Sequence, residues 1–309
     1  LFCNVDVPSV IESIDADSIY EVPVNMANEK LDHRVLYMLD IYNGTDSDMR
    51  KWNSFLKVLK NPEHEVTIGL AGKYIELKDA YKSIVEAFIH AGVMNKCKVN
   101  LRWIHSEKVD QENVQELLGD LDGVLVAPGF GERGIEGKIT TVQYVRENNI
   151  PFFGICLGMQ MAVIEYARHV LGWEDAHSTE MEPEAGHPVI DLMHDQQNVE
   201  NKGGTMRLGA YACKIQEKTL AKTIYGKAKI SERHRHRWEF NNAYKEDYEK
   251  SGMVLSGTNP DTGLVEIIEL PNHPFFIGVQ FRPELKSTVM NPHPLFVHFV
   301  KAALQHKLS

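Results

Sequence analysis

The segment Ile150–Gln160, which reads I-P-F-F-G-I-C-L-G-M-Q, constrains the fold more than any other stretch of this chain. An apolar run leads into Gly154, Cys156 follows two residues later, and Gly158 precedes an amphipathic stretch that continues to Leu171. This order predicts a buried strand, a tight turn and a helix, with the cysteine at the corner. A helix N-terminus favours the thiolate of such a cysteine, because its backbone N–H groups are unpaired and its dipole is positive there.

Two interpretations of Cys156 follow from this pattern. G-I-C-L-G is the cysteine counterpart of the nucleophile elbow G-x-S-x-G, in which small neighbours let a reactive side chain stand on a strained turn. A buried structural cysteine is the more common role of a free cysteine. The pentapeptide alone leaves both interpretations open.

Strand-like and helical patterns alternate around the elbow. Strands are predicted at 66–71, 99–104, 123–127 and 151–155, and helices at 78–92, 113–119, 138–148 and 160–171. This alternation predicts an α/β fold with a mostly parallel central sheet and helices on both faces. Reactive groups gather at the carboxyl ends of such strands, and both Cys156 and the glycine-rich loop Pro128–Gly137 follow strands there.

The two ends of the chain follow other patterns. Later short strands at 188–192, 205–212, 254–256, 265–269 and 275–281, with a closing helix at 294–306, predict an antiparallel extension of the sheet. The start predicts a strand at 1–5 and helices at 24–41 and 49–59. We expect a short appendage over 1–44, a linker over 45–62 and the main domain over 63–309. Because the chain starts at Leu1 in a strand-like run without a nearby partner, we expect it to be the C-terminal part of a longer protein.

Composition excludes several classes of protein. The chain has 33 Lys and Arg residues against 43 Asp and Glu, a net charge of −10, which argues against a chain-wide nucleic-acid surface. Its four cysteines show no C-x-x-C pairing, so we expect no disulfide framework or zinc site, and this usage is typical of the cytoplasm. No apolar run approaches the ~18 residues of a membrane span, and no signal peptide is visible. We therefore expect a cytoplasmic protein that binds neither nucleic acid nor membrane, nor any metal.

A cysteine nucleophile needs donors for the oxyanion and a partner for proton transfer. The backbone N–H groups of Gly129 and Leu157 are candidates for the oxyanion hole, although the loop P-G-F-G is also typical of an ordinary turn after a strand. The proton partner is usually a histidine oriented by a carboxylate. Near the end of the sheet Glu284 offers the carboxylate, but Arg282 stands two residues before it.

Five sequence blocks, in the order in which they occur, resemble the glutaminase domain of the CTP synthase family. Such domains are class I glutamine amidotransferases. They are P-G-F-G-E-R-G-I-E-G-K (128–138), G-I-C-L-G-M-Q (154–160), G-G-T-M-R-L-G (203–209), E-R-H-R-H-R-W-E (232–239) and V-Q-F-R-P-E-L (279–285). The resemblance covers the chain from about residue 62 to its end, and residues 1–42 resemble the tail of the family's synthetase domain.

The resemblance implies a mechanism and a set of partners. A cysteine attacks the side-chain amide carbon of glutamine, ammonia leaves, and water hydrolyses the glutamyl thioester. The ammonia then aminates UTP to CTP in a synthetase domain that uses ATP and Mg, and GTP activates the glutaminase. The resemblance implies no cofactor in this chain, L-glutamine and the synthetase domain as partners, and a homotetramer for the full-length protein.

The resemblance also assigns residues by position. Cys156 matches the nucleophile, Glu284 the orienting acid, and Gly129 with Leu157 the oxyanion hole. The glutamine pocket would contain Gly129, Leu157, Gly158, Met159, Gln160, Glu180 and Arg237. The chemistry of the pocket agrees, because glutamine's α-ammonium suits a carboxylate such as Glu180 and its α-carboxylate suits a guanidinium such as Arg237.

The main departure from the family is Arg282, which stands where the family has its catalytic histidine. Arginine keeps its proton at any physiological pH, since its pKa exceeds ~12, so it can neither act as a general base nor protonate departing ammonia. Its charge could still hold Cys156 as a thiolate. The sequence therefore predicts an impaired glutaminase, with a non-catalytic glutamine-binding or regulatory module as the alternative. A γ-glutamyl hydrolase of the same fold is a third reading, against which R-H-R-H-R weighs.

Three smaller features complete the analysis. The family loop usually reads P-G-G-F-G, and Pro128 here removes one backbone donor from it. His293 could replace the missing histidine, but we expect a surface residue there. The run R-H-R-H-R at 233–237 could form a nucleic-acid patch, yet its alternating histidines in an acidic chain favour a buried or interdomain polar network.

Overall fold

The computed structural model describes residues 4–192 and 206–309. The chain divides into two compact units, residues 1–62 and residues 63–309. None of the helices in the described ranges is both long and apolar enough to cross a membrane.

The first unit is built from short helices around a small aromatic cluster. Its elements are η1 (Val7–Ser9), η2 (Ile19–Glu21), α1 (Val22–Asn28), α2 (Leu31–Met38) and α3 (Arg50–Lys60). Tyr20 packs against Phe55 with ring centroids 5.1 Å apart, and the Trp52 indole N–H donates to the Tyr20 carbonyl at 2.7 Å. Residues 45–62, predicted as a linker, thus include a helix that packs within this unit.

Two predictions for the first unit were inaccurate. The helix predicted over 24–41 is divided into α1 and α2, because Lys30 adopts a left-handed conformation with φ of 59°. Residues 1–3 of the strand predicted at 1–5 lie outside the described residues, and Asn4 and Val5 are not in a strand.

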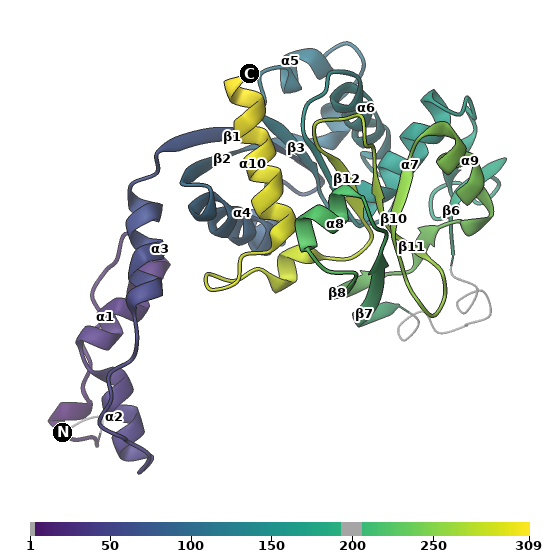
Figure 1. The fold of residues 1–309 in the computed structure, drawn as a ribbon. Coiled ribbons are helices and arrows are strands. Elements are labelled where there is room, and N and C mark those ends of the chain that lie inside the picture. Colours follow the sequence, from purple (N-terminus) through teal and green to yellow (C-terminus); the bar gives the residue numbers. More distant parts are fainter. Residues whose placement is uncertain (1–3, 193–205) are drawn as a thin grey trace. The chain divides into compact units, whose positions relative to one another are not determined.

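A nine-stranded sheet forms the centre of the second unit (Figure 1), in the order β2-β1-β3-β4-β12-β11-β10-β7-β8. Its strands are β1 (His64–Gly72), β2 (Cys97–His105), β3 (Gly123–Val126), β4 (Phe152–Ile155), β7 (Arg207–Ile215), β8 (Lys229–His236), β10 (Val254–Thr258), β11 (Val265–Glu269) and β12 (Phe276–Val279). The strands from β2 to β12 pair in parallel, and those from β12 to β8 pair antiparallel. A smaller sheet holds β5 (Ala176–Ser178), β6 (His187–Leu192) and β9 (Trp238–Phe240).

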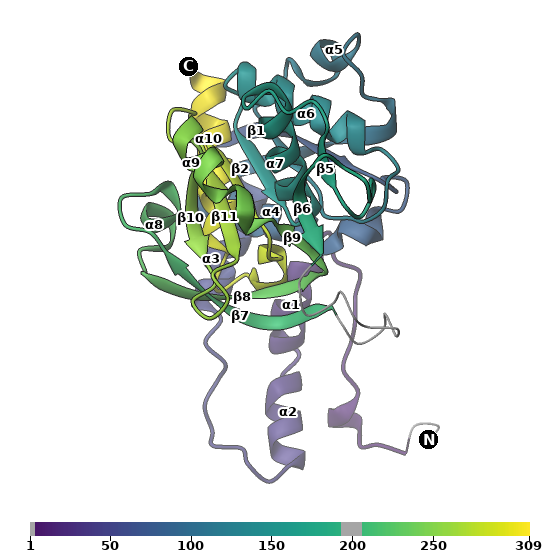
Figure 2. The same cartoon turned by 90° about the vertical axis from the view of Figure 1, so that its right-hand side faces the viewer.

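Helices cover both faces of the large sheet (Figure 2). One face packs against α4 (Lys82–Met94), α8 (Leu220–Tyr225) and α10 (Pro294–Leu308), and the other against α5 (Val114–Leu118), α6 (Ile135–Glu147), α7 (Leu157–His169) and α9 (Lys245–Ser251). Single 3-10 turns, η3 (Lys78–Tyr81), η4 (Ser106–Lys108), η6 (Asn242–Tyr244) and η7 (Pro283–Lys286), complete the unit. The predicted α/β fold with an antiparallel extension is confirmed.

The central strands supply apolar side chains to both cores, because successive residues of a strand point to opposite faces. Phe152 and Phe276 lie on the α7 face and stack with ring centroids 4.4 Å apart. Phe153 lies on the α10 face and contacts Phe296 and Phe299. Each of these rings is almost fully buried, and burying an aromatic side chain stabilises the fold by about 2–3 kcal/mol.

Several short elements were not predicted from the sequence. They are β5, α8, β8, β9 and α9. The strand β8 contains R-H-R-H and looks solvent-exposed by composition, but its burial alternates residue by residue. His234 and His236 point inward while Arg233 and Arg235 face solvent. The alternation typical of a strand is therefore present, but it runs between histidine and arginine and not between apolar and polar residues.

Backbone contact at two glycines fixes the elbow. A Cβ on Gly158 would lie 2.1 Å from the carbonyl oxygen of Val126, and one on Gly154 would lie 2.8 Å from the backbone of Gly158. The first turn of α7 therefore rests directly on the end of β3, which neighbours β4 in the sheet. This packing places Cys156 at the carboxyl edge of the parallel strands.

We expect Gly158→Ala to lower the free energy of unfolding by about 2 kcal/mol. The added Cβ meets a backbone oxygen that cannot rotate away, so α7 must shift, despite alanine's better helix propensity of about 1 kcal/mol. Urea unfolding followed by tryptophan fluorescence measures the change. Lys301→Ala, on the exposed face of α10, is the control and should shift stability by less than about 0.5 kcal/mol. An unchanged midpoint for Gly158→Ala would contradict the packing argument.

Candidate active site

Cys156 stands at the corner between β4 and α7. It is the N-cap of α7 and has φ of 54° and ψ of −104°, a region that residues other than glycine rarely adopt. Its backbone N–H donates to the carbonyl of Val279 in β12 at 2.7 Å, which ties the turn to the neighbouring strand. The predicted strand–turn–helix with a strained cysteine is confirmed.

A cavity of about 550 Å³ opens beside the sulfur. Six of the predicted site residues line it, namely Gly129, Cys156, Gln160, Glu180, Arg237 and Arg282. The other lining residues are Lys73, Tyr74, Ala80, Tyr81, Pro128, Phe130, Met206, Arg235, His236 and Trp238. The sulfur is thus not sealed in hydrocarbon, as a purely structural cysteine would be.

Four predicted residues lie beneath the cavity rather than along it. Leu157 and Met159 are packed in the core, and Gly158 rests against β3. Glu284 is 3% exposed and reaches the cavity only through Arg282. Leu157 acts through its backbone, whose N–H bonds to the Cys156 sulfur.

The thiol of Cys156 is neutral at physiological pH. Burial raises its pKa to about 11, and the negative charges of Glu284 and Glu180 add to this effect. The positive charge of Arg282 and the Leu157 N–H act in the opposite direction but do not offset burial. The side-chain N–H of Gln280 lies 3.7 Å from the sulfur.

Arg282, which is half-buried, forms an ion pair with buried Glu284 near the cysteine. The Arg282 Nε donates to Glu284 Oε1, and the Arg282 backbone N–H donates to the carbonyl of Arg233 at 2.7 Å. Burial raises the pKa of Glu284, and the guanidinium opposes that shift. Glu284 therefore holds the side chain two residues before it, and that side chain is a guanidinium.

The loop after β3 is anchored at three points. Buried Lys138 donates to the Ala127 carbonyl at 2.9 Å, and Lys73 donates to the carbonyl of Phe130 at 2.7 Å and to that of the next residue. Glu180 accepts the N–H of Gly131 at 2.8 Å. In the described part of the chain, nothing accepts a hydrogen bond from the Gly129 N–H, which remains available to an oxyanion at the exposed loop.

Sequence reasoning missed the two lysines of this loop. Lys138 is fully buried, and burial together with the charge of Lys73 lowers its pKa to about 7. It lies at the end of the block at 128–138, whose glycines give the clearer sequence signal. Lys73 follows Gly72 at the end of β1, a pair that lacks the full phosphate-loop pattern, so only the fold reveals its place in the cavity.

Glu180 and Gln160 occupy different parts of the cavity wall. Burial raises the pKa of Glu180, while the Gly131 N–H, Lys73 and Arg237 lower it. The Gln160 side-chain nitrogen donates to the Trp238 carbonyl at 2.8 Å and to Gln280 at 3.2 Å. That amide nitrogen is therefore used by the scaffold.

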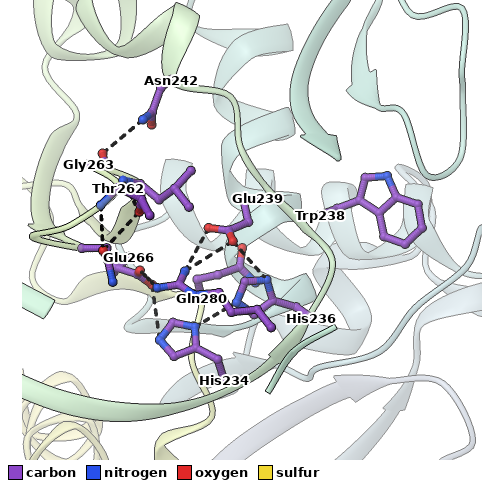
Figure 3. A network of polar contacts seen from close by, with 12 residues as sticks. His234, His236, Trp238, Glu239, Asn242, Thr262, Gly263, Glu266 and Gln280 are labelled. Atoms are coloured by element: carbon purple, nitrogen blue, oxygen red, sulfur yellow. Dashed lines mark hydrogen bonds and ion pairs between the residues drawn. The ribbon is translucent and has the colours of Figure 1, made fainter. Parts of the chain in front are cut away.

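A buried polar network supports the cavity from β7, β8 and β11 (Figure 3). Arg207 contacts Glu239 at 3.1 Å and Glu266 at 2.6 Å, and Figure 3 shows both carboxylates beside His234 and His236. The two imidazoles share a hydrogen bond of 2.8 Å between His234 Nδ1 and His236 Nε2.

Burial shifts the pKa values of the histidines and of the carboxyl groups in this network. Burial and the charge of Arg207 lower the pKa values of His234 and His236 to about 2 and about 3, so both are neutral. Burial raises the pKa values of Glu239 and Glu266 to about 7. The predicted buried network is confirmed for the histidines. The nucleic-acid interpretation is not supported, because only alternate residues of β8 are exposed, Arg233 and Arg235 among them.

His293 is buried, so the expectation of a surface histidine was wrong. It is 3% exposed and caps the N-terminus of α10, accepting the N–H of Leu295. Its Nε2 lies 3.1 Å from Glu232 Oε1, and nothing places it in the lining of the cavity. It therefore does not replace the missing catalytic histidine.

One block identified in the sequence is only partly described by the structure. Residues 203–205 of the block G-G-T-M-R-L-G lie outside the described residues, and Met206 of that block lines the cavity.

Over residues 4–192 and 206–309, no group of three or more His, Cys, Asp or Glu side chains is arranged to hold a metal ion.

The raised pKa predicts a slowly alkylated thiol. We expect the rate of Cys156 modification by iodoacetamide to rise from pH 7 to pH 10 without a plateau, because only the thiolate reacts. Arg282→Gln removes the charge that lowers the thiol pKa, so its rate should be slower at each pH, by about tenfold for each unit gained. Peptide mass mapping separates Cys156 from the other cysteines.

Lys78→Gln removes an exposed charge outside the cavity and is the matched control, with no expected effect on the rate. A plateau below pH 8 in the parent protein would show that Cys156 is already a thiolate and would contradict the burial argument.

Comparison with known proteins agrees with this geometry. The family described as glutamine amidotransferase class-I matches residues 76–302. CTP synthases from Cytophaga hutchinsonii and Caldanaerobacter subterraneus are 64% and 54% identical over 98% and 100% of this chain, and the chain covers 56% and 57% of their lengths. The chain thus spans little more than half the length of these curated relatives.

A solved structure gives the same result. The Trypanosoma brucei CTPS glutaminase domain with bound acivicin is 40% identical and superposes with a TM-score of 0.73, over 78% of this chain and 94% of that one. Because the family matches most of the chain and the solved domain is covered almost completely, this chain belongs to the class I glutamine amidotransferase family, as a glutaminase domain of the CTP synthase type.

Proposed function

We propose that the cavity binds L-glutamine with its side-chain amide toward Cys156. Glu180 would hold the α-ammonium and Arg237 the α-carboxylate, since each pairing joins opposite charges. The Gly129 N–H would face the amide oxygen. The convergence of these groups on one cavity supports the proposal, and so does the acivicin bound in the solved glutaminase domain.

The chemistry proceeds in two stages. The Cys156 sulfur loses its proton and bonds to the amide carbon of glutamine, and the oxyanion that forms is stabilised by backbone N–H groups. The carbon–nitrogen bond then breaks, and ammonia leaves after it gains one proton. Water adds to the thioester carbon, which releases glutamate and returns the thiol. Each stage moves a proton near the sulfur, so a group that exchanges protons is needed there.

Arg282 is the observation that decides how well this chain performs the reaction. It lines the cavity with Cys156, pairs with Glu284 and acts by its charge on the thiol, and the proposed reaction requires a proton-transfer group there. A guanidinium keeps its proton, so it can stabilise a thiolate by charge but cannot accept or deliver the proton. We infer that glutamine binds while its hydrolysis is strongly slowed.

Arg282→His should increase the rate of glutamate release by about 10²–10⁴-fold, because it restores a proton-transfer group held by Glu284. A coupled glutamate dehydrogenase assay measures the rate. Arg282→Lys is the matched control, since an ammonium beside Glu284 keeps the charge without an imidazole's proton exchange near neutral pH. The proposal fails if the parent and Arg282→His hydrolyse glutamine equally fast, and charge alone would suffice if Arg282→Lys equals Arg282→His.

A non-catalytic glutamine-binding or regulatory module is the second candidate, and Arg282 together with the neutral thiol favours it. A diazoketone analogue of glutamine separates the candidates. We expect it to label Cys156 in the parent protein while glutamate release stays at background, which is the behaviour of a binding module. Glu180→Gln should slow the labelling if the α-ammonium is held there. Measurable turnover in the parent would instead support an impaired enzyme.

The remaining functions belong to the longer protein. We propose that residues 1–44 are the tail of a synthetase domain, that 45–62 link it to the amidotransferase domain at 63–309, and that ammonia released here aminates UTP to CTP. ATP and Mg would act in that synthetase domain, GTP would activate the glutaminase, and the full-length protein would be a cytoplasmic homotetramer. The identity to CTP synthases along the whole chain supports these proposals.

A further inference from the structure

The cavity is unusually cationic for a site that holds a neutral side-chain amide. Lys73, Arg235, Arg237 and Arg282 line it, while Glu180 is the one carboxylate among its described lining residues. Lys73 is used by the loop carbonyls and Glu180 by a backbone N–H. Arg282 therefore adds a further positive charge to the cavity, and that charge acts on the Cys156 thiol.

The guanidinium of Arg282 retains an unused edge. Its Nε is bonded to Glu284, and within the described part of the chain neither Nη atom has a hydrogen-bond partner. A guanidinium can bind carboxylates along two edges, and occupation of Nε leaves the edge formed by the two Nη atoms. The side chain is 21% exposed and lines the cavity, and its charge acts on the Cys156 thiol and on Tyr81.

We propose that the cavity binds L-glutamate, and this inference rests on the proposed glutamine site. The side-chain carboxylate of glutamate pairs with the free edge of Arg282. Glutamate and glutamine share the α-ammonium and α-carboxylate, so Glu180 and Arg237 treat them alike. They differ only at the side-chain end, where glutamate offers two anionic oxygens and glutamine offers one neutral oxygen and an NH₂ donor. Two nitrogen donors on a residue that lines the cavity suit the first and repel the N–H groups of the second.

The ion pair with Glu284 does not cancel this preference. Glu284 lies beneath the cavity and uses one oxygen on Nε, so it fixes the guanidinium plane rather than blocking its outer edge. A planar donor held by a buried partner loses little freedom when it binds a carboxylate. The neutral thiol beside it adds no competing negative charge. Arginine at position 282 thus removes proton transfer and also makes glutamate, the product of the reaction, the preferred ligand.

Isothermal titration calorimetry of the chain at pH 7.5 with L-glutamate and with L-glutamine tests the proposal. We expect glutamate to bind the parent protein about tenfold or more tightly than glutamine, as a charge-assisted pair replaces a neutral contact. In Arg282→His the two Nη donors and the permanent charge of the guanidinium are gone, and the order should reverse. Arg282→Gln, which offers no charge, should also lose the preference for glutamate, and it keeps the test valid if the histidine variant folds poorly.

The outcomes separate the two proposals. Glutamine binding that equals or exceeds glutamate binding in the parent would overturn the glutamate site and leave the glutamine site intact. A preference for glutamate that persists in Arg282→Gln would place its origin elsewhere and would also overturn the inference. If neither amino acid binds the parent protein, the proposed function fails and the glutamate site fails with it. Circular dichroism of each variant confirms that it is folded.

Discussion

The contact between the first turn of α7 and the end of β3 is the constraint on which this domain depends. The Gly158 backbone sits where any Cβ would meet the Val126 carbonyl, and this closeness forces the tight turn that holds Cys156 at a positive φ. The turn also brings the sulfur to the edge where parallel strands end, next to the loop that follows β3. One backbone contact therefore sets the position of Cys156, and with it the position of the Leu157 N–H that begins α7.

Burial, rather than the helix dipole, sets the charge of the nucleophile in this chain. The helix N-terminus and Arg282 both favour a thiolate, but desolvation and two nearby carboxylates outweigh them. The same effect keeps His234 and His236 neutral and raises the pKa values of the carboxylates around Arg207. Burial therefore controls the charges of the groups around the cavity. The proposed reaction needs a proton carrier, because burial keeps the Cys156 thiol protonated.

The sequence predicted the elbow and the parallel half of the sheet because both rest on local patterns. Apolar runs, glycines and helical spacing around Cys156 act over a few residues, and Gly158 is required by a contact that only a small residue permits. The strand β8 was missed because three of its four inward residues are polar, and two of them are histidines that pair with each other and with a carboxylate from a distant strand. His293 and Lys138 were misjudged or overlooked for the same reason, since their partners Glu232 and Ala127 are brought to them only by the fold.

Arg282 shows why a folded site does not guarantee a working one. A buried carboxylate such as Glu284 is costly to the fold when it is unpaired, and arginine satisfies it with a charged hydrogen bond. The elbow and the loop after β3 are held by other contacts, Gly158 against Val126 and Lys138 on Ala127, so neither depends on the Arg282 side chain. Stability and ligand binding depend on charges and donors that arginine supplies, whereas turnover depends on a proton that arginine does not release. In the proposed function, residue 282 therefore separates recognition of the ligand from its hydrolysis.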